Sequence, residues 1–459
     1  MNITIISDSI YTKKSNPTIT MAKAFAERGH KVNVILPFYE KHYSDKALEF
    51  EFVGASNVKI PKGDFDIKLY SLNNGDICYY FISNNKLFSR EKEWGYSDDA
   101  VRTMMFCTAS IETLLNNDIA VDSIISDCPN TSLISVLLKL KYHTSARLRN
   151  IKCYQYINKQ NNARYDKSVI TSVFGLSPDE KHILICKNEV NLTKAAIICA
   201  SRIFVGENAV SILYDRNDDL HHTVIQFGFK IRKIRLGIDY STFSPEYDVD
   251  IHKPFSTEDP CNRVANKLFV QKYLYLKESA DIPLIVLYQN RNNDIWHKYK
   301  HELTRCDIQI IIVSDKIKQG DMPMISERCI YIQDKSTETL KNIFSAADFC
   351  VFGCLDSECS NPAFIAASYG CVPILPRHRF YDHGFSYFNK LTLDGNGYTY
   401  DPNIPTDILY TLWDALGVYR HDKKTYQKLL QNTMKKVFSA SESIEIIEKE
   451  TEKTVYSFI

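Results

Sequence analysis

Residues 344–375 read FSAADFCVFGCLDSECSNPAFIAASYGCVPIL, and this stretch decides the fold. The apolar run 349–352 has the aromatic and β-branched content of a buried strand. An acidic turn follows, and Pro362 suits the first turn of a helix, where its missing N–H costs nothing. We expect that helix over 363–369, ended by Gly370, and a second buried strand over 371–375. Ligands bind beyond the carboxyl ends of strands in doubly wound sheets, so the acidic loop is a candidate site.

Length and composition limit the class of protein. A chain of 459 residues with 44% apolar residues predicts two or three domains with full cores. The 56 lysines and arginines balance 55 aspartates and glutamates, which argues against a nucleic-acid footprint or an acidic tail. The 13 cysteines lack paired zinc spacing, so buried free thiols are favoured over a metal site. There are only 16 glycines, below the usual roughly 7%, and phosphate loops depend on glycine.

The ends and the hydropathy of the chain bear on its location. The sequence enters a predicted strand directly after Met1, without the pattern of a signal peptide. No apolar run approaches the length of a membrane span. We therefore expect a soluble cytoplasmic protein without a membrane span.

Strands and helices alternate in both halves of the sequence. Predicted strands cover 2–7, 32–37, 124–127 and 154–158 in the first half, and 283–288, 308–313 and 329–332 in the second. A β-rich insertion is expected over 48–82, and a last helix over 444–458. This alternation is typical of two Rossmann-like halves.

The stretch that opens this section resembles the donor-site segment of glycosyltransferases with the GT-B fold. The resemblance is closest to bacterial glycogen synthases and plant starch synthases, where a strand is followed by Glu-Pro-Cys-Gly, an apolar helix, Tyr-Gly and a strand containing proline. The residues in register are Cys359, Tyr369, Gly370 and Pro373. Ser357 stands at the family's glutamate position, between Asp356 and Glu358.

The most specific part of the resemblance joins the two halves. It comprises Leu236-Gly-Ile-Asp239, Phe243-Ser-Pro245, Asp248, Asn266-Lys267 and Gln271, at the spacing of the synthases. The resemblance implies an α/β protein of GT-B fold, with two Rossmann-like domains facing across a cleft. Residues 1–238 would form the acceptor-side domain, completed by the returning C-terminal helix 441–459. Residues 239–440 would form the nucleotide-sugar domain.

Four positions of the first half correspond to family site residues, and we expect them to bind substrate or take part in catalysis. Lys14 matches the lysine of the family's phosphate loop, although a solvated surface loop fits that segment as well. Phe88 replaces a sugar-facing tyrosine and keeps a ring that can stack on a sugar. Asp127 matches an aspartate that follows a strand, and we assign it a catalytic role. Asn158 matches the asparagine of a His-Asn pair, although an isolated asparagine there also suits a turn.

Three positions of the second half complete the predicted site. Arg291 lies one position from the family arginine that neutralises the leaving diphosphate, whereas Ile295 replaces the family lysine. Arg291 can also be interpreted as an exposed loop residue in a polar run. Glu358 is the second catalytic candidate of this half, and Arg377 matches a family arginine and should bind substrate.

The resemblance implies retaining transfer of a hexose, expected to be glucose, from a nucleotide diphosphate sugar to a glucan or another acceptor. ADP-glucose or UDP-glucose would be the co-substrate. No resident cofactor or metal is expected, because arginine and lysine can stabilise the departing diphosphate. Several family donors are replaced, so the alternative is a non-catalytic relative that binds glucan or a protein partner.

Overall fold

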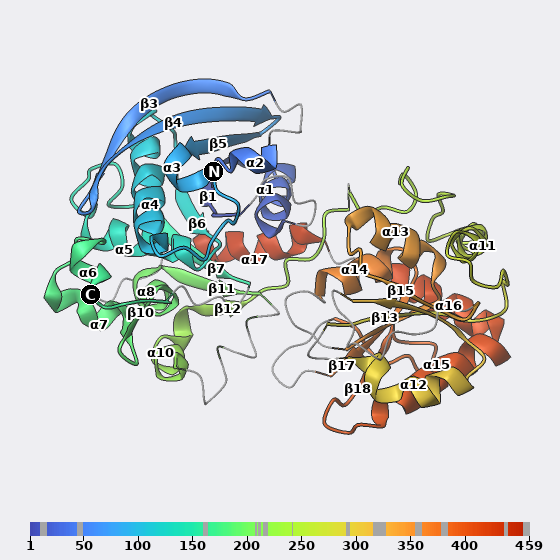
Figure 1. The fold of residues 1–459 in the computed structure, drawn as a ribbon. Helices are drawn as coiled ribbons and strands as arrows, with labels where there is room; N and C mark the ends of the chain where they lie inside the picture. Colours follow the sequence, from blue (N-terminus) through green and yellow to red (C-terminus); the bar gives the residue numbers. More distant parts are fainter. Residues whose placement is uncertain are drawn as a thin grey trace. The chain divides into compact units, whose positions relative to one another are not determined.

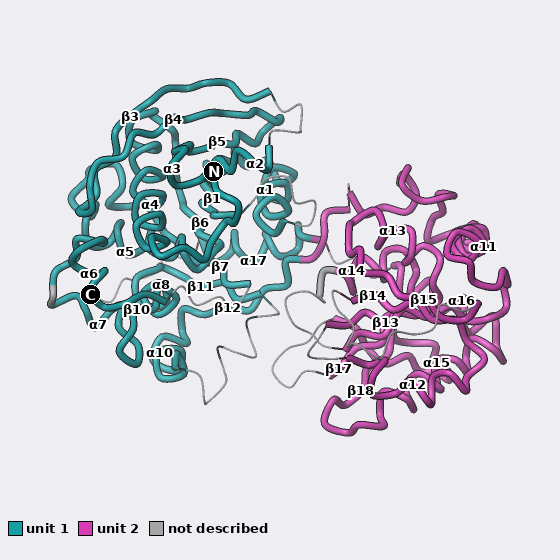
Figure 2. The backbone as a smooth tube through the Cα atoms, in the orientation of Figure 1, with its two compact units in different colours: residues 1–236, 440–459 teal, residues 237–439 magenta. Residues whose placement is uncertain are grey.

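The computed structural model describes residues 1–9, 16–43, 49–158, 164–206, 209, 213, 219–240, 242–290, 294–314, 327–353, 360–377, 384–435 and 439–452. The chain forms two compact units (Figure 2). Unit 1 contains Met1–Leu236 and Ala440–Ile459, and unit 2 contains Gly237–Ser439. Lys14, Arg291 and Glu358 lie outside the described residues.

Unit 1 is built around one sheet, whose nine described strands have the order β12-β11-β7-β6-β1-β2-β5-β4-β3 (Figure 1). Neighbouring strands are parallel from β12 to β5, and β4 is antiparallel to both β5 and β3. The strands are β1 (Asn2–Ile6), β2 (Lys31–Pro37), β3 (Glu51–Ile60), β4 (Gly63–Asn74), β5 (Ile77–Ser83), β6 (Ser123–Ser126), β7 (Lys152–Ile157), β11 (Arg202–Val205) and β12 (Ile231–Lys233). The β-rich insertion expected over 48–82 is therefore confirmed as β3, β4 and β5.

Helices and a small sheet complete unit 1. The helices are α1 (Pro17–Glu27), α2 (Glu40–Tyr43), α3 (Asn85–Phe88), α4 (Asp99–Asn116), α5 (Leu133–Leu140), α6 (Val169–Ser172), α7 (Lys181–Leu184), α8 (Leu192–Cys199), α10 (His221–Gln226) and α17 (Ala440–Glu452). The small antiparallel sheet contains β8 (Arg164–Tyr165), β9 (Ile185–Cys186) and β10 (Glu189–Asn191). α1 begins where the sequence places a proline at the first helical turn, with Asn16 as its N-cap.

The last described helix, α17, packs on the first unit beside α1 (Figure 1). The guanidinium of Arg28 donates two hydrogen bonds to Glu448, from Nε at 2.9 Å and from Nη2 at 2.7 Å. Arg202 pairs with the buried Glu450 at 3.0 Å. These ion pairs join α17 to the end of α1 and to β11. Compared with the expected 444–458, α17 begins four residues earlier, at Ala440.

Unit 2 contains a parallel sheet with the order β15-β14-β13-β16-β17-β18. Its strands are β13 (Leu284–Tyr288), β14 (Gln309–Val313), β15 (Cys329–Ile332), β16 (Phe349–Phe352), β17 (Val372–Pro376) and β18 (Tyr398–Tyr400). Its helices are α11 (Arg263–Tyr273), α12 (Ile295–Arg305), α13 (Thr337–Ala346), α14 (Ser360–Ser368), α15 (Asp407–His421) and α16 (Lys423–Lys435). The strand, helix and second strand predicted from 344–375 are confirmed as β16, α14 and β17. Residues 354–359 of the acidic loop before α14 lie outside the described residues.

The sheet of unit 2 is buried on both faces, which explains its continuous apolar strands. In β13, Leu284, Val286 and Tyr288 belong to one core together with side chains of α11, α13 and α14. The alternate residues Ile285 and Leu287 belong to a second core with side chains of α12 and α15. Helices on both faces of a parallel sheet confirm the predicted α/β class.

Candidate active site

A cavity of about 670 Å³ opens in unit 1 at the carboxyl edge of the parallel sheet. It lies where β1, β6 and β7 end and where α1 begins. This is the position at which ligands bind in open α/β sheets. The cavity is lined by Asp8, Ser9, Asn16, Pro17, Thr18, Glu93, Trp94, Gly95, Asp99, Asp127, Cys128, Pro129, Asn130, Asn158, Arg164 and Tyr165.

Asp127 lines this cavity directly after the end of β6. Its carboxylate accepts a hydrogen bond from the hydroxyl of Thr18, in the first turn of α1. The thiol of Cys128 donates to the other carboxylate oxygen at 3.0 Å. Burial raises the pKa of Asp127, and these hydrogen bonds oppose the rise. The side chain is thus fixed at the sheet edge, and its catalytic role stays a prediction.

Asp8 is a second buried carboxylate in the cavity, and sequence reasoning missed it. It follows β1, the strand next to β6, and it accepts a hydrogen bond of 2.7 Å from the amide of Asn130. Burial, reinforced by the neighbouring charge of Asp127, raises the pKa of Asp8 to about 6. The available signal was an acidic residue directly after a buried strand, which is the same pattern that indicated Asp127.

A chain of polar side chains extends from Asp8 across the cavity. The carboxamide oxygen of Asn130 accepts a hydrogen bond of 3.0 Å from the hydroxyl of Tyr165. The same hydroxyl lies 2.9 Å from the hydroxyl of Thr103. Burial raises the pKa of Tyr165, so its hydroxyl keeps its proton and remains a donor at neutral pH. This network fixes the orientation of Asn130.

Asn158 lines the cavity directly after β7, as the expected register places it. Its side chain lies against Gly206, which follows β11. A Cβ atom on Gly206 would stand 2.5 Å from the amide oxygen of Asn158 and 2.8 Å from the hydroxyl of Tyr156. The absence of a side chain at 206 therefore permits the observed position of Asn158. Substrate binding by Asn158 stays a prediction.

The rim of the cavity is organised by a buried arginine that sequence reasoning did not single out. Arg102 is fully buried, and its guanidinium carbon lies 4.6 Å from the ring centre of Trp94. It donates from Nη1 to Asp99 at 2.8 Å. The other carboxylate oxygen of Asp99 accepts the N–H groups of Gly95 at 2.7 Å and Tyr96 at 3.0 Å. Arg102 thus positions the loop that carries Trp94.

The cavity lining is acidic. Asp8, Glu93, Asp99 and Asp127 contribute carboxylates, whereas Arg164 is the single lysine or arginine among the described lining residues. Arg164 pairs with Asp219 at 3.1 Å and with Glu189 at 3.4 Å. Lining of this charge suits a neutral ligand rich in hydroxyl groups better than a diphosphate.

Phe88 lies in the core of unit 1. Its side chain is 2% exposed, and its ring contacts the rings of Tyr39 and Phe106, with centres 5.9 and 6.1 Å away. Stacking of Phe88 on a sugar would require this packing to open, and the role stays a prediction.

Unit 2 carries the predicted donor-side residues, of which Arg377 is described. Arg377 follows β17, its side chain is 63% exposed, and Nη2 lies 3.6 Å from Asp407. Lys335 is a further cation at the carboxyl edge of this sheet, and sequence reasoning missed it. Its ammonium lies 4.9 Å from the ring centre of Tyr288 and 3.5 Å from the carbonyl oxygen of Gln289. The sequence signal for Lys335 is its position shortly after the predicted strand 329–332.

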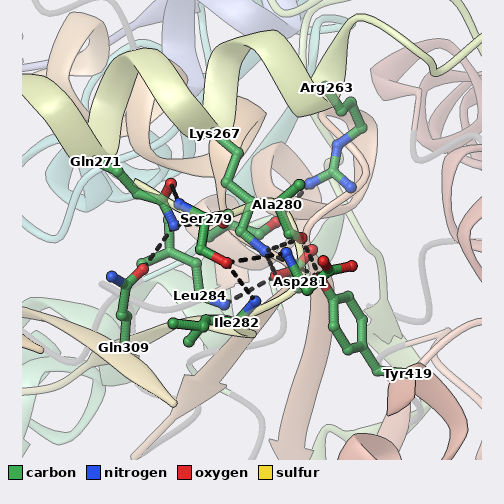
Figure 3. A network of polar contacts seen from close by, with 12 residues as sticks. Arg263, Lys267, Gln271, Ser279, Ala280, Asp281, Ile282, Leu284, Gln309 and Tyr419 are labelled. Carbon is green, nitrogen blue, oxygen red and sulfur yellow. Dashed lines mark hydrogen bonds and ion pairs between the residues drawn. The ribbon is translucent and has the colours of Figure 1, made fainter. Parts of the chain in front are cut away.

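The Asn-Lys segment of α11 stabilises the opposite edge of the same sheet (Figure 3). Lys267 is buried and binds Asp348 at 2.7 Å, the hydroxyl of Tyr419 at 2.9 Å and a backbone carbonyl. Asp348 also accepts the N–H of Leu284 at the start of β13, at 2.8 Å. The segment with the most specific resemblance therefore has a structural role here.

Comparison with solved structures shows which known fold the chain has. The catalytic domain of starch synthase IV from Arabidopsis thaliana, solved with ADP and acarbose, has a TM-score of 0.85 and 20% identity, and the match covers 98% of both chains. Sucrose-phosphate synthase from Thermosynechococcus elongatus has a TM-score of 0.55 and 11% identity over 98% of both chains. The chain has the GT-B glycosyltransferase fold.

Sequence comparison shows which families of glycosyltransferases the chain is similar to. The starch synthase catalytic domain family matches residues 18–216. Glycogen synthase of Alkaliphilus metalliredigens is 26% identical over 433 residues, covering 88% of this chain and 89% of the relative. Glycogen synthase of Clostridioides difficile is 26% identical over 439 residues, covering 90% of each. The chain is similar to the glycogen and starch synthases over most of its length, and the resemblance seen in the sequence is confirmed.

The part of the chain that the structure describes contains neither a membrane-spanning helix nor a metal-binding cluster. None of its helices is long and apolar enough to cross a membrane. Its histidines, cysteines and carboxylates form no group of three that could hold a metal ion.

Proposed function

We propose that the protein transfers a hexose, glucose in the first instance, from a nucleotide diphosphate sugar to an α-glucan with retention of configuration. The acidic cavity of unit 1 is the observation that supports this proposal. Its carboxylates and amides can accept and donate hydrogen bonds to sugar hydroxyls, and Trp94 offers a ring beside them. The similarity to glycogen synthases over nine-tenths of the chain supports the same assignment.

Within this proposal, Asp127 and Asn158 bind the sugar at the end of the sheet of unit 1. Asp8 and Asn130 extend the same polar wall. The hydrogen bonds that fix Asp127 and Asn130 hold these groups ready before the substrate arrives, so little reorganisation is needed in the transition state.

The departing diphosphate requires cations, and the one cation among the described lining residues, Arg164, is paired with carboxylates. We assign that task to Arg291 and Arg377, with Lys335 as an additional cation of unit 2 and Lys14 from unit 1. Arginine can bind two phosphate oxygens at once, which suits the charge that develops on the leaving group. Glu358 remains the second catalytic candidate. The proposal requires no resident cofactor or metal.

The partners follow from the reaction. They are a nucleotide sugar, ADP-glucose or UDP-glucose, and a glucan or related carbohydrate acceptor, with no role for nucleic acid. Both kinds of substrate are available in the cytoplasm, where we place the protein.

Calorimetric titration with ADP-glucose and with UDP-glucose tests the proposal. Saturable binding of one of them, followed by release of the nucleoside diphosphate, is the expected result. Glucan binding without binding of either nucleotide sugar would instead support the non-catalytic relative.

A further inference from the structure

A row of stacked, solvent-exposed rings lies along α11 in unit 2; Phe269 and Tyr273 belong to the helix, and His252 stacks on Phe269 from the preceding segment. His252 and Phe269 are stacked with ring centres 4.2 Å apart and an interplanar angle of 2°. Phe269 and Tyr273 follow with centres 6.4 Å apart and an angle of 13°. Tyr273 is 74% exposed and Phe269 is 41% exposed. Aromatic surface of this extent on one helix face indicates a binding surface.

Tyr275 extends this aromatic surface beyond the end of the helix, in an unusual backbone conformation. The N–H of Leu276 donates to the carbonyl of Gln271 at 2.8 Å, and the N–H of Tyr275 donates to the carbonyl of Lys272 at 3.2 Å. These two bonds define a Schellman motif, in which the position of Tyr275 is usually glycine. Tyr275 has φ +58°, the left-handed region that disfavours bulky residues.

The ring of Tyr275 contributes little packing that could offset the cost of this strained backbone conformation. The residue is 84% exposed, so it buries almost no apolar surface. A strained residue that does not contribute to packing is a candidate for function. The group that Tyr275 exposes to solvent is its aromatic ring, so a function of this residue would involve the ring.

Tyr273 and Tyr275 line a groove of about 570 Å³ that also contains charged residues. Its lining is Lys272, Tyr273, Tyr275, Leu276, Lys277, Glu278 and Glu327. In this described lining two lysines balance two glutamates, which favours a neutral polar ligand over an ionic partner. Leu276 is the one aliphatic side chain among the described lining residues and is buried, so that part of the lining offers no apolar pocket typical of a protein–protein hot spot.

We propose that this groove is a second carbohydrate-binding site, which holds an α-glucan chain on unit 2 and shares no lining residue with the cavity of unit 1. The flat C–H faces of successive glucose rings would stack on Tyr273 and Tyr275. Their hydroxyl groups would bind the lysine and glutamate side chains. The choice of an α-glucan among carbohydrates rests on the proposed function, whereas the aromatic groove itself does not.

Affinity electrophoresis of the full chain through gels containing glycogen tests the site, without any nucleotide sugar. We expect Tyr273→Ala and Tyr275→Gly each to weaken glycogen binding by about tenfold, the scale of losing one stacked ring. Tyr275→Gly should unfold at the same or a higher temperature than the wild type, because glycine relieves the strained position. Loss of glycogen binding in this variant therefore cannot be attributed to misfolding. Tyr410→Ala is the matched control, since Tyr410 is 62% exposed on α15.

The outcomes separate this site from the proposed transferase. Unchanged retardation in both groove variants would overturn the site, even if the protein transfers glucose. Loss of retardation in these variants would support the site, even if no transfer were measured. The other occupant to test is a second copy of the chain, and sedimentation of the same variants tests it. If the wild type is a dimer, and the variants are monomers with unchanged glycogen binding, the rings contact a second copy and the carbohydrate site is overturned.

Discussion

Gly206 lies so close to Asn158 that a Cβ atom on the glycine would stand 2.5 Å from the amide oxygen. The two residues follow neighbouring parallel strands, β11 and β7, and the contact fixes Asn158 in the cavity lining.

Gly206→Ala should therefore displace Asn158 and lower the rate of hexose transfer. A shift of about 1 Å in a positioning group can cost roughly 100-fold, and we expect a loss of about 10- to 100-fold. Steady-state assays with saturating nucleotide sugar measure it. Gly228→Ala is the control, because a Cβ there would meet nothing within 4 Å. If Gly206→Ala and Gly228→Ala are equally active, the assignment of Asn158 to the substrate site is wrong.

Asp8 should make the stability of the protein depend on pH. The rise of its pKa from 3.8 to about 6 means that the folded state retains this proton at pH values where the unfolded chain has lost it. Its contribution to the unfolding free energy is therefore most favourable below about pH 4 and falls as the pH rises to about 6, by about 3 kcal/mol in total.

Asp8→Asn should remove this fall, and urea unfolding of both proteins at several pH values between about 4 and 7 measures the difference. Asp64→Asn serves as the exposed control. If the wild type and Asp8→Asn show parallel pH profiles, the carboxyl group of Asp8 does not titrate as its buried position implies.

Arg102 should be more important for stability than Arg90, although both pair with aspartates at the start of α4. Arg102 is fully buried, and Arg102→Ala leaves Asp99 without its cation, which should cost about 3–5 kcal/mol of unfolding free energy. Arg90 is partly exposed and pairs with Asp98, so Arg90→Ala should cost about 1 kcal/mol or less. Denaturant unfolding compares the two. Similar losses would show that Arg102 does not organise the cavity rim.

The sequence predicts the fold well because apolar periodicity follows from burial. Strands with apolar residues on both faces, such as β13, require helices on each side, and the order of strands and helices then limits the topology. Helix boundaries were less accurate: α17 begins at Ala440, where no proline or glycine marks the start.

The site was harder to predict because its residues come from distant segments. Asp8 and Asp127 meet through the parallel pairing of β1 with β6, and no local pattern links them. Resemblance alone does not assign a role: Lys267 belongs to the pattern in register with the family, and it forms a buried ion pair with Asp348. Sequence similarity marks a residue as constrained, and only its contacts show whether packing or substrate imposes the constraint.

Transfer of labelled glucose to glycogen, measured for the wild type and for Arg291→Ala, tests the central claim most directly. The account predicts transfer from ADP-glucose or UDP-glucose by the wild type and a loss of about two to three orders of magnitude in the variant, the scale for one electrostatic donor. Arg328→Ala, with a side chain that is 64% exposed, should keep full activity. Full turnover by Arg291→Ala would contradict the assigned role, and absence of transfer from both nucleotide sugars by the folded wild type would contradict the account itself.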